Sequence, residues 1–295
     1  MREEGVLAVL DIAEWGAPIE VAEGARATRA LEEGRVLFLP SLSFAVDEPE
    51  KPFLTPSSLA PGRKNISFDP ATGECQGSRH TGAEAARLGA MLDRFGRQAE
   101  ALLRALAPGY TQGLRRARTS FRPADVEDRP SSVRQDDRLL HVDAFPTRPT
   151  RGERILRVFS NIAPDGAERR WEVGEPFPAF AEKFLPRVKP GRAASAWLIE
   201  RLGLTKGRRS AYDTIMLGLH DAMKQDAAYQ AGAPHASLAF PPGTSWIVYT
   251  DQVLHAALAG RFALEQTFHL PVAAMAEPER APIRVLERLA GHALA

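Results

Sequence analysis

The stretch Leu139-Leu140-His141-Val142-Asp143-Ala144-Phe145 is an apolar run that is interrupted by a histidine and an aspartate two positions apart. On an extended strand, residues i and i+2 point to the same face. The imidazole of His141 and the carboxylate of Asp143 should therefore converge on one point. Together they supply two ligands of the 2-His-1-carboxylate triad, which binds non-haem Fe(II) and leaves coordination positions open. The stretch predicts a metal site, provided that a second histidine reaches it from elsewhere in the chain.

His255 is the best candidate for that third ligand among the seven histidines of the chain. It follows a predicted strand, Ser245 to Thr250, and a turn, and the small residues Ala256 and Ala257 beside it leave space around a metal. A His-x-Asp pair followed by a distal histidine on a later strand is the order that a double-stranded β-helix oxygenase requires. The alternative is a His-Asp pair at a strand end without a metal, because an isolated tripeptide of this kind is a weak signal.

Length and composition are those of an ordinary soluble globular protein. The 295 residues are 44% hydrophobic and 25% charged, which allows a full core without disulfides. Cys75 is the only cysteine, so neither an intrachain disulfide nor a cysteine-rich zinc site is expected. The net charge of +1 argues against nucleic acid as a partner. We recognise neither a secretory signal nor an apolar stretch long enough to cross a membrane, and we expect a cytoplasmic protein.

Periodic patterns predict an α+β protein with a double-stranded β-helix core, the jelly-roll or cupin-like fold, and with flanking and inserted helices. Strands are expected at 35–40, 116–122, 154–162, 245–250 and 262–271, where β-branched and aromatic residues are frequent. A long helix should begin at the capping box Thr81-Gly82-Ala83-Glu84 and end before Pro108-Gly109. A second helix is expected after Ser210, and residues 41–80 should form a long loop.

These elements form a single domain, residues 1–295, in this interpretation. Residues 1–110 provide helical and loop support, 111–170 and 240–272 form the β-helix core, 171–235 form a helical insertion, and 273–295 form a C-terminal helix. The strand pattern resumes after residue 235, and this is why the inserted helices are not assigned to a separate domain.

Three segments of the chain resemble the Kdo hydroxylase family. The first runs from Leu139 to Arg157, the second comprises Tyr212-Asp213 and Leu219-His220-Asp221-Ala222-Met223-Lys224, and the third runs from Trp246 to Phe268. The resemblance implies an Fe(II)- and 2-oxoglutarate-dependent dioxygenase of lipopolysaccharide biosynthesis in Gram-negative bacteria. Its expected reaction is hydroxylation at C3 of 3-deoxy-D-manno-oct-2-ulosonic acid (Kdo) in Kdo-lipid A, which gives Ko. By this resemblance His141, Asp143 and His255 are the iron ligands, 2-oxoglutarate and O2 are cosubstrates, and succinate and CO2 are products.

The second carboxylate of 2-oxoglutarate requires an arginine or a lysine. Many members of the wider superfamily use an arginine of the final strand, but Phe262 to Ala273 contains neither residue type, and Gln266 stands there instead. The strand predicted earlier in the chain offers Arg154 and Arg157 on opposite faces. We expect Arg157 to bind 2-oxoglutarate, with Asn161 and Gln266 as helpers. A surface ion pair is the alternative for Arg157.

Arginines near the predicted site suit a substrate that carries carboxylates and phosphates. We expect Arg118, Arg122, Arg148 and Arg151 to contact it, within a wider set that also contains Arg116, Arg169, Arg170, Arg208 and Arg209. A lipid A substrate would require peripheral contact with the inner membrane surface, for which Trp171, Phe177, Phe180 and Phe184 are candidates. Solvated surface arginines and a helix packed on the barrel are the alternatives.

Two other functions remain compatible with the sequence. One is a 2-oxoglutarate oxygenase that acts on another small molecule or on a protein. The other is a cupin-like metal-binding protein without catalytic activity, which would need no pocket for 2-oxoglutarate. An intact triad together with a second anion site favours an enzyme.

Overall fold

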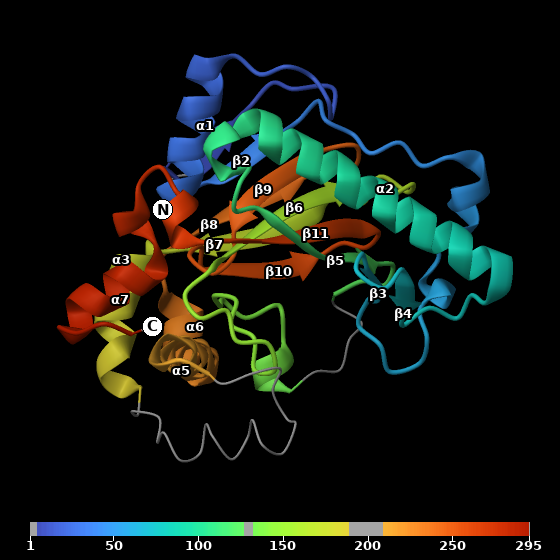
Figure 1. Ribbon diagram of the computed structural model, residues 1–295. Coiled ribbons are helices and arrows are strands. Elements are labelled where there is room, and N and C mark those ends of the chain that lie inside the picture. Colours follow the sequence, from blue (N-terminus) through green and yellow to red (C-terminus); the bar gives the residue numbers. More distant parts are fainter. Residues whose placement is uncertain (1–4, 127–131, 189–208, 295) are drawn as a thin grey trace.

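Two β-sheets that face each other form the centre of the structure, a computed structural model that describes residues 5–126, 132–188 and 209–294 (Figure 1). The larger sheet has eight strands in the order β1-β2-β9-β6-β11-β5-β3-β4, and the smaller has three in the order β10-β7-β8. Adjacent strands pair antiparallel except β1 and β2, which are parallel. The expected α+β class with a jelly-roll core is confirmed.

The strands of the larger sheet are β1 (Leu7–Val9), β2 (Val36–Leu39), β9 (Ser245–Tyr249), β6 (Arg154–Asn161), β11 (Ala263–Leu270), β5 (Arg115–Arg122), β3 (Ile66–Asp69) and β4 (Glu74–Gln76). Those of the smaller sheet are β10 (His255–Ala259), β7 (Arg169–Gly174) and β8 (His235–Phe240). The described helices are α1 (Val21–Glu32), α2 (Gly82–Leu106), α3 (Phe177–Phe184), α5 (Ala211–Gln225), α6 (Ala227–Gly232) and α7 (Pro282–Ala290). Short 3-10 helices include η2 (Glu48–Phe53), η3 (Pro56–Ser58), η4 (Pro108–Tyr110) and η5 (Val133–Gln135).

Strand β6 shows how the sequence sets the two layers. It pairs with β9 on one side and β11 on the other, and all eight of its residues are buried. Leu156 and Val158 belong to the core under the helices, whereas Phe159 belongs to the core between the two sheets. Successive side chains of a strand alternate between faces, so Arg157 points between the sheets together with Phe159.

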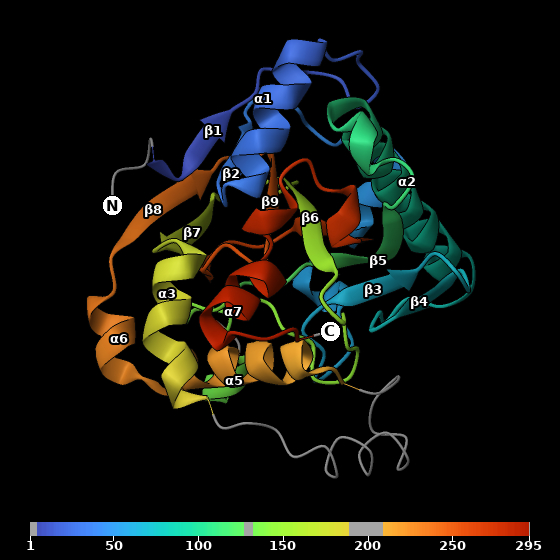
Figure 2. The same cartoon turned by 60° about the vertical axis from the view of Figure 1, so that its left-hand side comes forward.

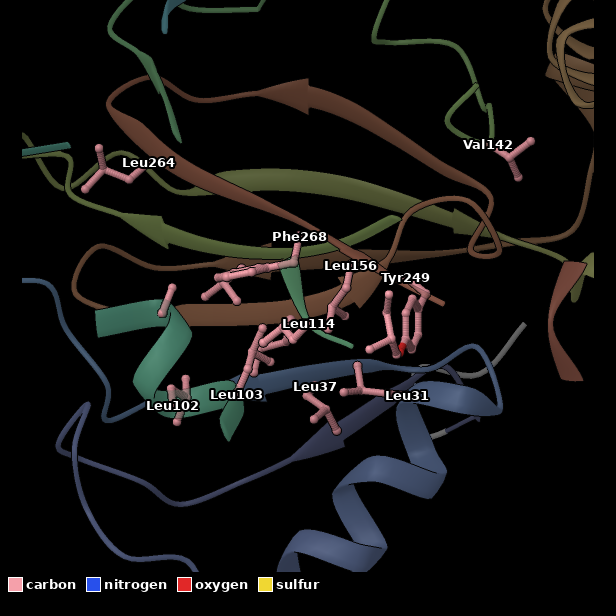
Figure 3. Packing of buried hydrophobic residues seen from close by; sticks show 14 of the residues in the cluster. Leu31, Leu37, Leu102, Leu103, Leu114, Val142, Leu156, Tyr249, Leu264 and Phe268 are labelled. Carbon is pink, nitrogen blue, oxygen red and sulfur yellow. The ribbon is translucent and has the colours of Figure 1, made fainter. Parts of the chain in front are cut away.

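The outer face of the large sheet is covered by α1 and α2 (Figure 1). Figure 3 shows the leucines of both helices packed on side chains of β2, β6, β9 and β11. The packed residues include Leu31, Leu102 and Leu103 from the helices and Leu37, Leu156, Tyr249 and Phe268 from the sheet. Helix α2 has the expected extent. Thr81 is its N-cap residue, but the Thr81 side chain makes no capping hydrogen bond, so the predicted capping box is absent there.

A second group of helices lies on the other side of the fold, where α3, α5 and α7 pack together (Figure 2). Helix α5 begins as predicted after Ser210. The Ser210 hydroxyl accepts a hydrogen bond from the Asp213 N–H at 3.2 Å, and the Asp213 carboxylate accepts one from the Ser210 N–H at 2.8 Å. This reciprocal pair satisfies two donors at the start of the helix.

The helical insertion expected at 171–235 is wrong at both ends, because residues 171–174 belong to β7 and His235 begins β8. In β8, Ala236, Leu238 and Phe240 are buried and the residues between them are exposed, which is the alternation of a strand with one buried face. The expected loop 41–80 is likewise interrupted by β3 and β4. Of these missed strands, β7 and β8 belong to the small sheet, and β3 and β4 form one edge of the large sheet.

The four aromatic residues expected at the membrane are all buried. Trp171, Phe177, Phe180 and Phe184 expose between 0% and 3% of their surface, so the expected membrane contact through these side chains is wrong. Trp171 lies between the sheets, and the three phenylalanines pack in the helical layer. In the parts of the chain that the structure describes, no helix combines the length and the apolar composition needed to cross a bilayer.

Candidate active site

His141 and His255 are joined through their main chains. The N–H of each donates to the carbonyl oxygen of the other, at 3.0 and 2.9 Å, and this forms an isolated antiparallel bridge. The stretch 139–145 is therefore not the regular strand that we expected, since only His141 in it makes such a bridge. His255 follows β9 and a turn, as expected, and is the first residue of β10. The bridge places the two imidazole centroids 4.5 Å apart.

Both imidazoles are held in one tautomer by main-chain carbonyls. The Nδ1 of His141 donates to Leu139 O, and the Nδ1 of His255 donates to Val253 O, each at 2.8 Å. A carbonyl oxygen can only accept, so each Nδ1 carries the proton and each Nε2 keeps its lone pair. Burial lowers the pKa of both histidines, with the charges of His255 and Lys224 acting in the same direction on His141. Two neutral imidazoles with free Nε2 atoms result, as metal binding requires.

Asp143 completes the group from the same segment. Its N–H donates to Thr250 O at 2.8 Å, which fixes the backbone beside the loop that precedes β10. Asp143 Oδ1 lies 3.9 Å from His141 Nε2, and one ligand atom from each of the three residues lies within 4.8 Å of the others. Burial would raise the pKa of Asp143, but Arg157 and the two histidines lower it, so the carboxylate is ionised. This donor set, two imidazole nitrogens and one carboxylate oxygen, fits Fe(II).

Two aromatic side chains, neither of them predicted at the metal site, hold the histidines. The indole of Trp171 stacks on the His255 ring at 5.1 Å and 22°. The ring of His220 meets the His141 ring edge-on at 5.8 Å. Trp171 lies on β7, where a helix was predicted, and the alternation of buried and exposed residues at the start of β7 is the signal that indicates the strand. His220 belongs to α5 and lay within a segment that carries the family resemblance.

Four charged side chains form a network beside the three residues. Arg157 contacts Asp143 Oδ2 at 3.0 Å and Glu265 Oε1 at 2.7 Å. Arg122 contacts Glu265 at 2.9 Å and Asp137 at 3.5 Å. Glu265 is thus shared by two arginines, which lower its pKa although burial acts in the opposite direction. Glu265 was not among the predicted site residues, because Gln266, its neighbour on the opposite face of β11, was expected there instead.

Of the three residues expected to bind 2-oxoglutarate, only Arg157 lies at this site. It is 9% exposed and makes buried ion pairs, so the surface alternative is wrong for it. The buried Nε of Arg157 has no hydrogen-bond partner among the described residues. The positions of Asn161 and Gln266 contradict the expectation. The Asn161 amide donates to Ala167 O and Phe240 O at 2.9 Å, which closes a loop between the sheets.

Gln266 faces α2 instead of the space between the sheets. Its side chain accepts from Thr119 at 2.5 Å and donates to Ala117 O at 3.1 Å. Helix α2 passes so close that a Cβ added to Gly96 would overlap with Gln266 and with the Arg116 guanidinium. The periodicity of β11 explains the error, because Glu265 and Thr267, the neighbours of Gln266, point to the site face.

The arginines expected at the substrate have different environments. Arg118 contacts Asp69 at 3.2 Å. Arg148 is largely exposed, and its partial desolvation and the charge of Arg118 lower its pKa. Arg151 is exposed and its backbone φ is 54°. Arg122 belongs to the buried network. In the wider set, Arg116 contacts Asp93 on the helical face, Arg169 donates to Gly260 O, Arg170 is on β7, Arg209 donates to Pro146 O, and Arg208 lies outside the described residues.

A jelly-roll core that brings together two neutral imidazoles and one carboxylate defines the class of non-haem iron oxygenases. The family described as 3-deoxy-D-manno-oct-2-ulosonic acid (Kdo) hydroxylase matches residues 14–293 of the chain. The chain therefore belongs to the Kdo hydroxylase family, whose members are non-haem Fe(II)- and 2-oxoglutarate-dependent dioxygenases. This membership does not favour the alternative of a metal-binding protein without turnover.

Solved structures give the same relationship. The chain is similar to the Kdo hydroxylase KdoO in complex with α-ketoglutarate and Fe(III), with 43% identity, a TM-score of 0.94, and coverage of 98% of this chain and 97% of the other. It is also similar to KdoO with succinate and Fe(III), with 44% identity and a TM-score of 0.93, and to KdoO with cobalt(II), with a TM-score of 0.95. Coverage is the same in both cases. No curated protein sequence gives a significant match.

Proposed function

We propose that this protein hydroxylates C3 of Kdo in Kdo-lipid A and thereby forms Ko. One atom of O2 enters the new C–OH group, and the other enters succinate when 2-oxoglutarate loses CO2. The observation that carries the proposal is the convergence of His141, Asp143 and His255 with two free Nε2 atoms. Membership of the Kdo hydroxylase family supports the substrate. The structures of KdoO with α-ketoglutarate and succinate support the cosubstrate and the product.

His141, Asp143 and His255 would hold the iron, which activates O2 once 2-oxoglutarate is bound. The main-chain carbonyls of Leu139 and Val253 keep both imidazoles in the tautomer that presents Nε2. Trp171 and His220 restrict rotation of the two rings through their stacking and edge contacts. The protein thus fixes the three donors before the metal arrives, and the buried surroundings limit access of water to the reacting groups.

Arg157 is the proposed partner of the distal carboxylate of 2-oxoglutarate. Its guanidinium is buried between the sheets beside Asp143, and its Nε lacks a hydrogen-bond partner in the described structure. A carboxylate placed there would receive a charge-assisted hydrogen bond. Replacement of Arg157 by Lys should therefore raise the KM for 2-oxoglutarate by about tenfold or more, measured by succinate release. An unchanged KM would remove Arg157 from this role.

Arg118, Arg148 and Arg151 are proposed to meet anionic groups of the glycolipid. Arg148 and Arg151 are exposed, and Arg118 is one-quarter exposed in its side chain. Because the acyl chains of lipid A lie in a bilayer, we propose that the protein works in the cytoplasm at the inner membrane surface. Binding to vesicles that contain Kdo-lipid A, compared with vesicles of neutral lipid, tests this part of the proposal.

Mass spectrometry of Kdo-lipid A after incubation with enzyme, Fe(II), 2-oxoglutarate and O2 tests the reaction. The product should gain the mass of one oxygen, and the new hydroxyl should be located at C3. Under anaerobic conditions Fe(II) and 2-oxoglutarate should give the weak visible absorption band of their chelate. His141→Ala should lose both the band and the product, whereas the exposed His292→Ala should keep both. A chelate band without any change of Kdo-lipid A would point to an oxygenase with another substrate.

A further inference from the structure

Two lysines from distant parts of the chain converge on η5. Lys224 of α5 is only 3% exposed, and its ammonium donates to Arg134 O at 3.2 Å. Lys64, which precedes β3, donates to the carbonyl oxygen of the next residue, Gln135. Burial and the charge of Lys64 both lower the pKa of Lys224, as expected for two neighbouring ammonium groups. Figure 1 shows the light-green segment that contains η5 lying between α5 and the β3–β4 hairpin.

Neither ammonium makes an ion pair with a carboxylate, although the charges of Asp137, Asp143 and Asp136 raise the pKa of Lys224. Among the described residues, no carboxylate lies within ion-pair distance of Lys64 or Lys224, in contrast to Arg122 and Arg157, each of which has two. The acidic residues nearest in sequence to η5 have other partners. Asp136 is held by Arg138 at 2.7 Å, and Asp137 contacts Arg122 at 3.5 Å. A buried cation is costly unless an anion accompanies it, so this pair of lysines suits a bound anion.

The lysine pair lies next to the proposed iron ligands. Lys224 is one helical turn after His220, so both side chains emerge from the same face of α5, and the His220 ring contacts the His141 ring. Gln230 of α6 accepts from Leu140 N–H at 2.8 Å and donates to Leu140 O at 3.1 Å. These bonds fix the segment that carries His141 against the helices that carry the lysine.

We infer that Lys64 and Lys224 form a carboxylate subsite that binds the C1 carboxylate of Kdo and thereby places C3 at the iron. The inference rests on the proposed function and adds the residues that orient the sugar. In an oct-2-ulosonic acid, the carboxylate is attached to C2, and C2 is bonded to the deoxygenated C3. A group that holds the carboxylate therefore determines which carbon faces the iron.

The position of the pair favours the sugar over 2-oxoglutarate as its ligand. Residues 132–135 are exposed and Lys64 is partly exposed, so the Lys64 end of the pair reaches the surface, whereas Lys224 lies buried behind it. A Kdo residue that is attached to a large glycolipid must approach from that side. Arg157, the proposed partner of 2-oxoglutarate, lies instead in the buried layer between the sheets.

A comparison of two substrates tests the subsite. A Kdo glycoside and its C1 methyl ester differ only in the negative charge that the lysines would bind. The wild-type enzyme should prefer the carboxylate in kcat/KM by about 30-fold or more, because an unpaired buried charge costs this much in recognition. Lys224→Met should lose this preference, and Lys224→Arg should retain part of it. Lys64→Met should show a smaller loss, since Lys64 is less buried. The exposed Lys51→Met is the matched control and should behave as the wild type.

The other measurements separate the possible failures. The anaerobic Fe(II)–2-oxoglutarate band and the KM for 2-oxoglutarate should be unchanged in Lys224→Met, which also shows that this variant is folded. If the band is lost while the melting temperature is retained, the lysines bind 2-oxoglutarate and the inference is wrong. If Lys224→Met keeps the wild-type preference for the carboxylate, the subsite is refuted and the proposed function stands. If the wild type hydroxylates neither compound, nor Kdo-lipid A, the proposed function fails and the subsite with it.

Discussion

Removal of Asp251 should destabilise the protein strongly, because this carboxylate neutralises an arginine that has no contact with solvent. Arg154 is 0% exposed, and its guanidinium donates to Asp251 at 2.7 and 3.3 Å and to Gln252 at 2.6 Å. Breaking a buried ion pair from one side costs about 3–5 kcal/mol. Asp251→Ala should therefore lower the free energy of unfolding by about 3–5 kcal/mol and the Tm by roughly 10 °C.

Replacing both partners should be less harmful than removing one of them. Burial raises the pKa of Asp251 above its usual value even though Arg154 lies against it, so desolvation outweighs the attraction within the pair. The double variant Arg154→Met and Asp251→Leu leaves no unpaired charge and should recover at least about half of the loss.

Urea denaturation followed by far-UV circular dichroism measures both effects. Asp165→Ala is the control, because Asp165 makes an ion pair with Arg261 at the surface, and such pairs contribute about 0–1 kcal/mol. The reasoning is refuted if Asp251→Ala loses no more stability than Asp165→Ala. It is also refuted if the double variant is less stable than Asp251→Ala.

Three further predictions concern residues around the site and the single thiol. Trp171→Ala should lower the free energy of unfolding by about 3–5 kcal/mol and weaken Fe(II) binding about tenfold or more. Titration of the chelate band measures the binding. Trp171→Phe keeps an aromatic ring on His255 and should bind Fe(II) nearly as tightly as the wild type. Asp213→Ala removes the carboxylate that accepts hydrogen bonds from the backbone N–H groups of Ser210, Thr150 and Arg151 at 2.8 to 3.0 Å. It should lower the free energy of unfolding by about 1–3 kcal/mol and speed tryptic cleavage after Arg151. Equal cleavage rates in the variant and the wild type would contradict this. Burial raises the pKa of Cys75 to about 11, so the thiol is protonated near neutral pH. Its alkylation at pH 8 should therefore be about a hundredfold slower in the folded protein than in the urea-unfolded chain. Comparable rates would show that the thiol is accessible and that its pKa is unperturbed.

The predicted helices and strands that agree with the structure are those whose pattern of apolar residues follows from burial of one face or of both faces. The apolar period of α2 and the β-branched and aromatic residues of β6 need no knowledge of their partners, because each sequence is compatible with one kind of element. The convergence of His141, Asp143 and His255 followed from residue spacing and from the resemblance. The regular strand expected around His141 was wrong, and a single main-chain bridge produces the same convergence.

The errors arose where a local pattern does not determine which face of a strand meets which layer. Gln266 and Glu265 are adjacent in β11, and only the register with β6 shows that Glu265 faces Arg157. Trp171 and Phe180 are large apolar side chains of the kind that contact membranes, but the small sheet and the helical layer bury them. Such assignments depend on long-range pairing, which a single sequence does not reveal.

The hydrogen bonds from His141 and His255 to the carbonyls of Leu139 and Val253 have a consequence for how this centre changes over evolutionary time. In many metal sites a carboxylate side chain orients the histidine, and one substitution removes it. Here the acceptors belong to the polypeptide backbone, which every amino acid provides. Residues 139 and 253 can therefore vary without loss of the tautomer, provided that the path of the backbone is kept. Insertions or deletions near these residues, rather than point substitutions, are the changes that would abolish the orientation of the ligands.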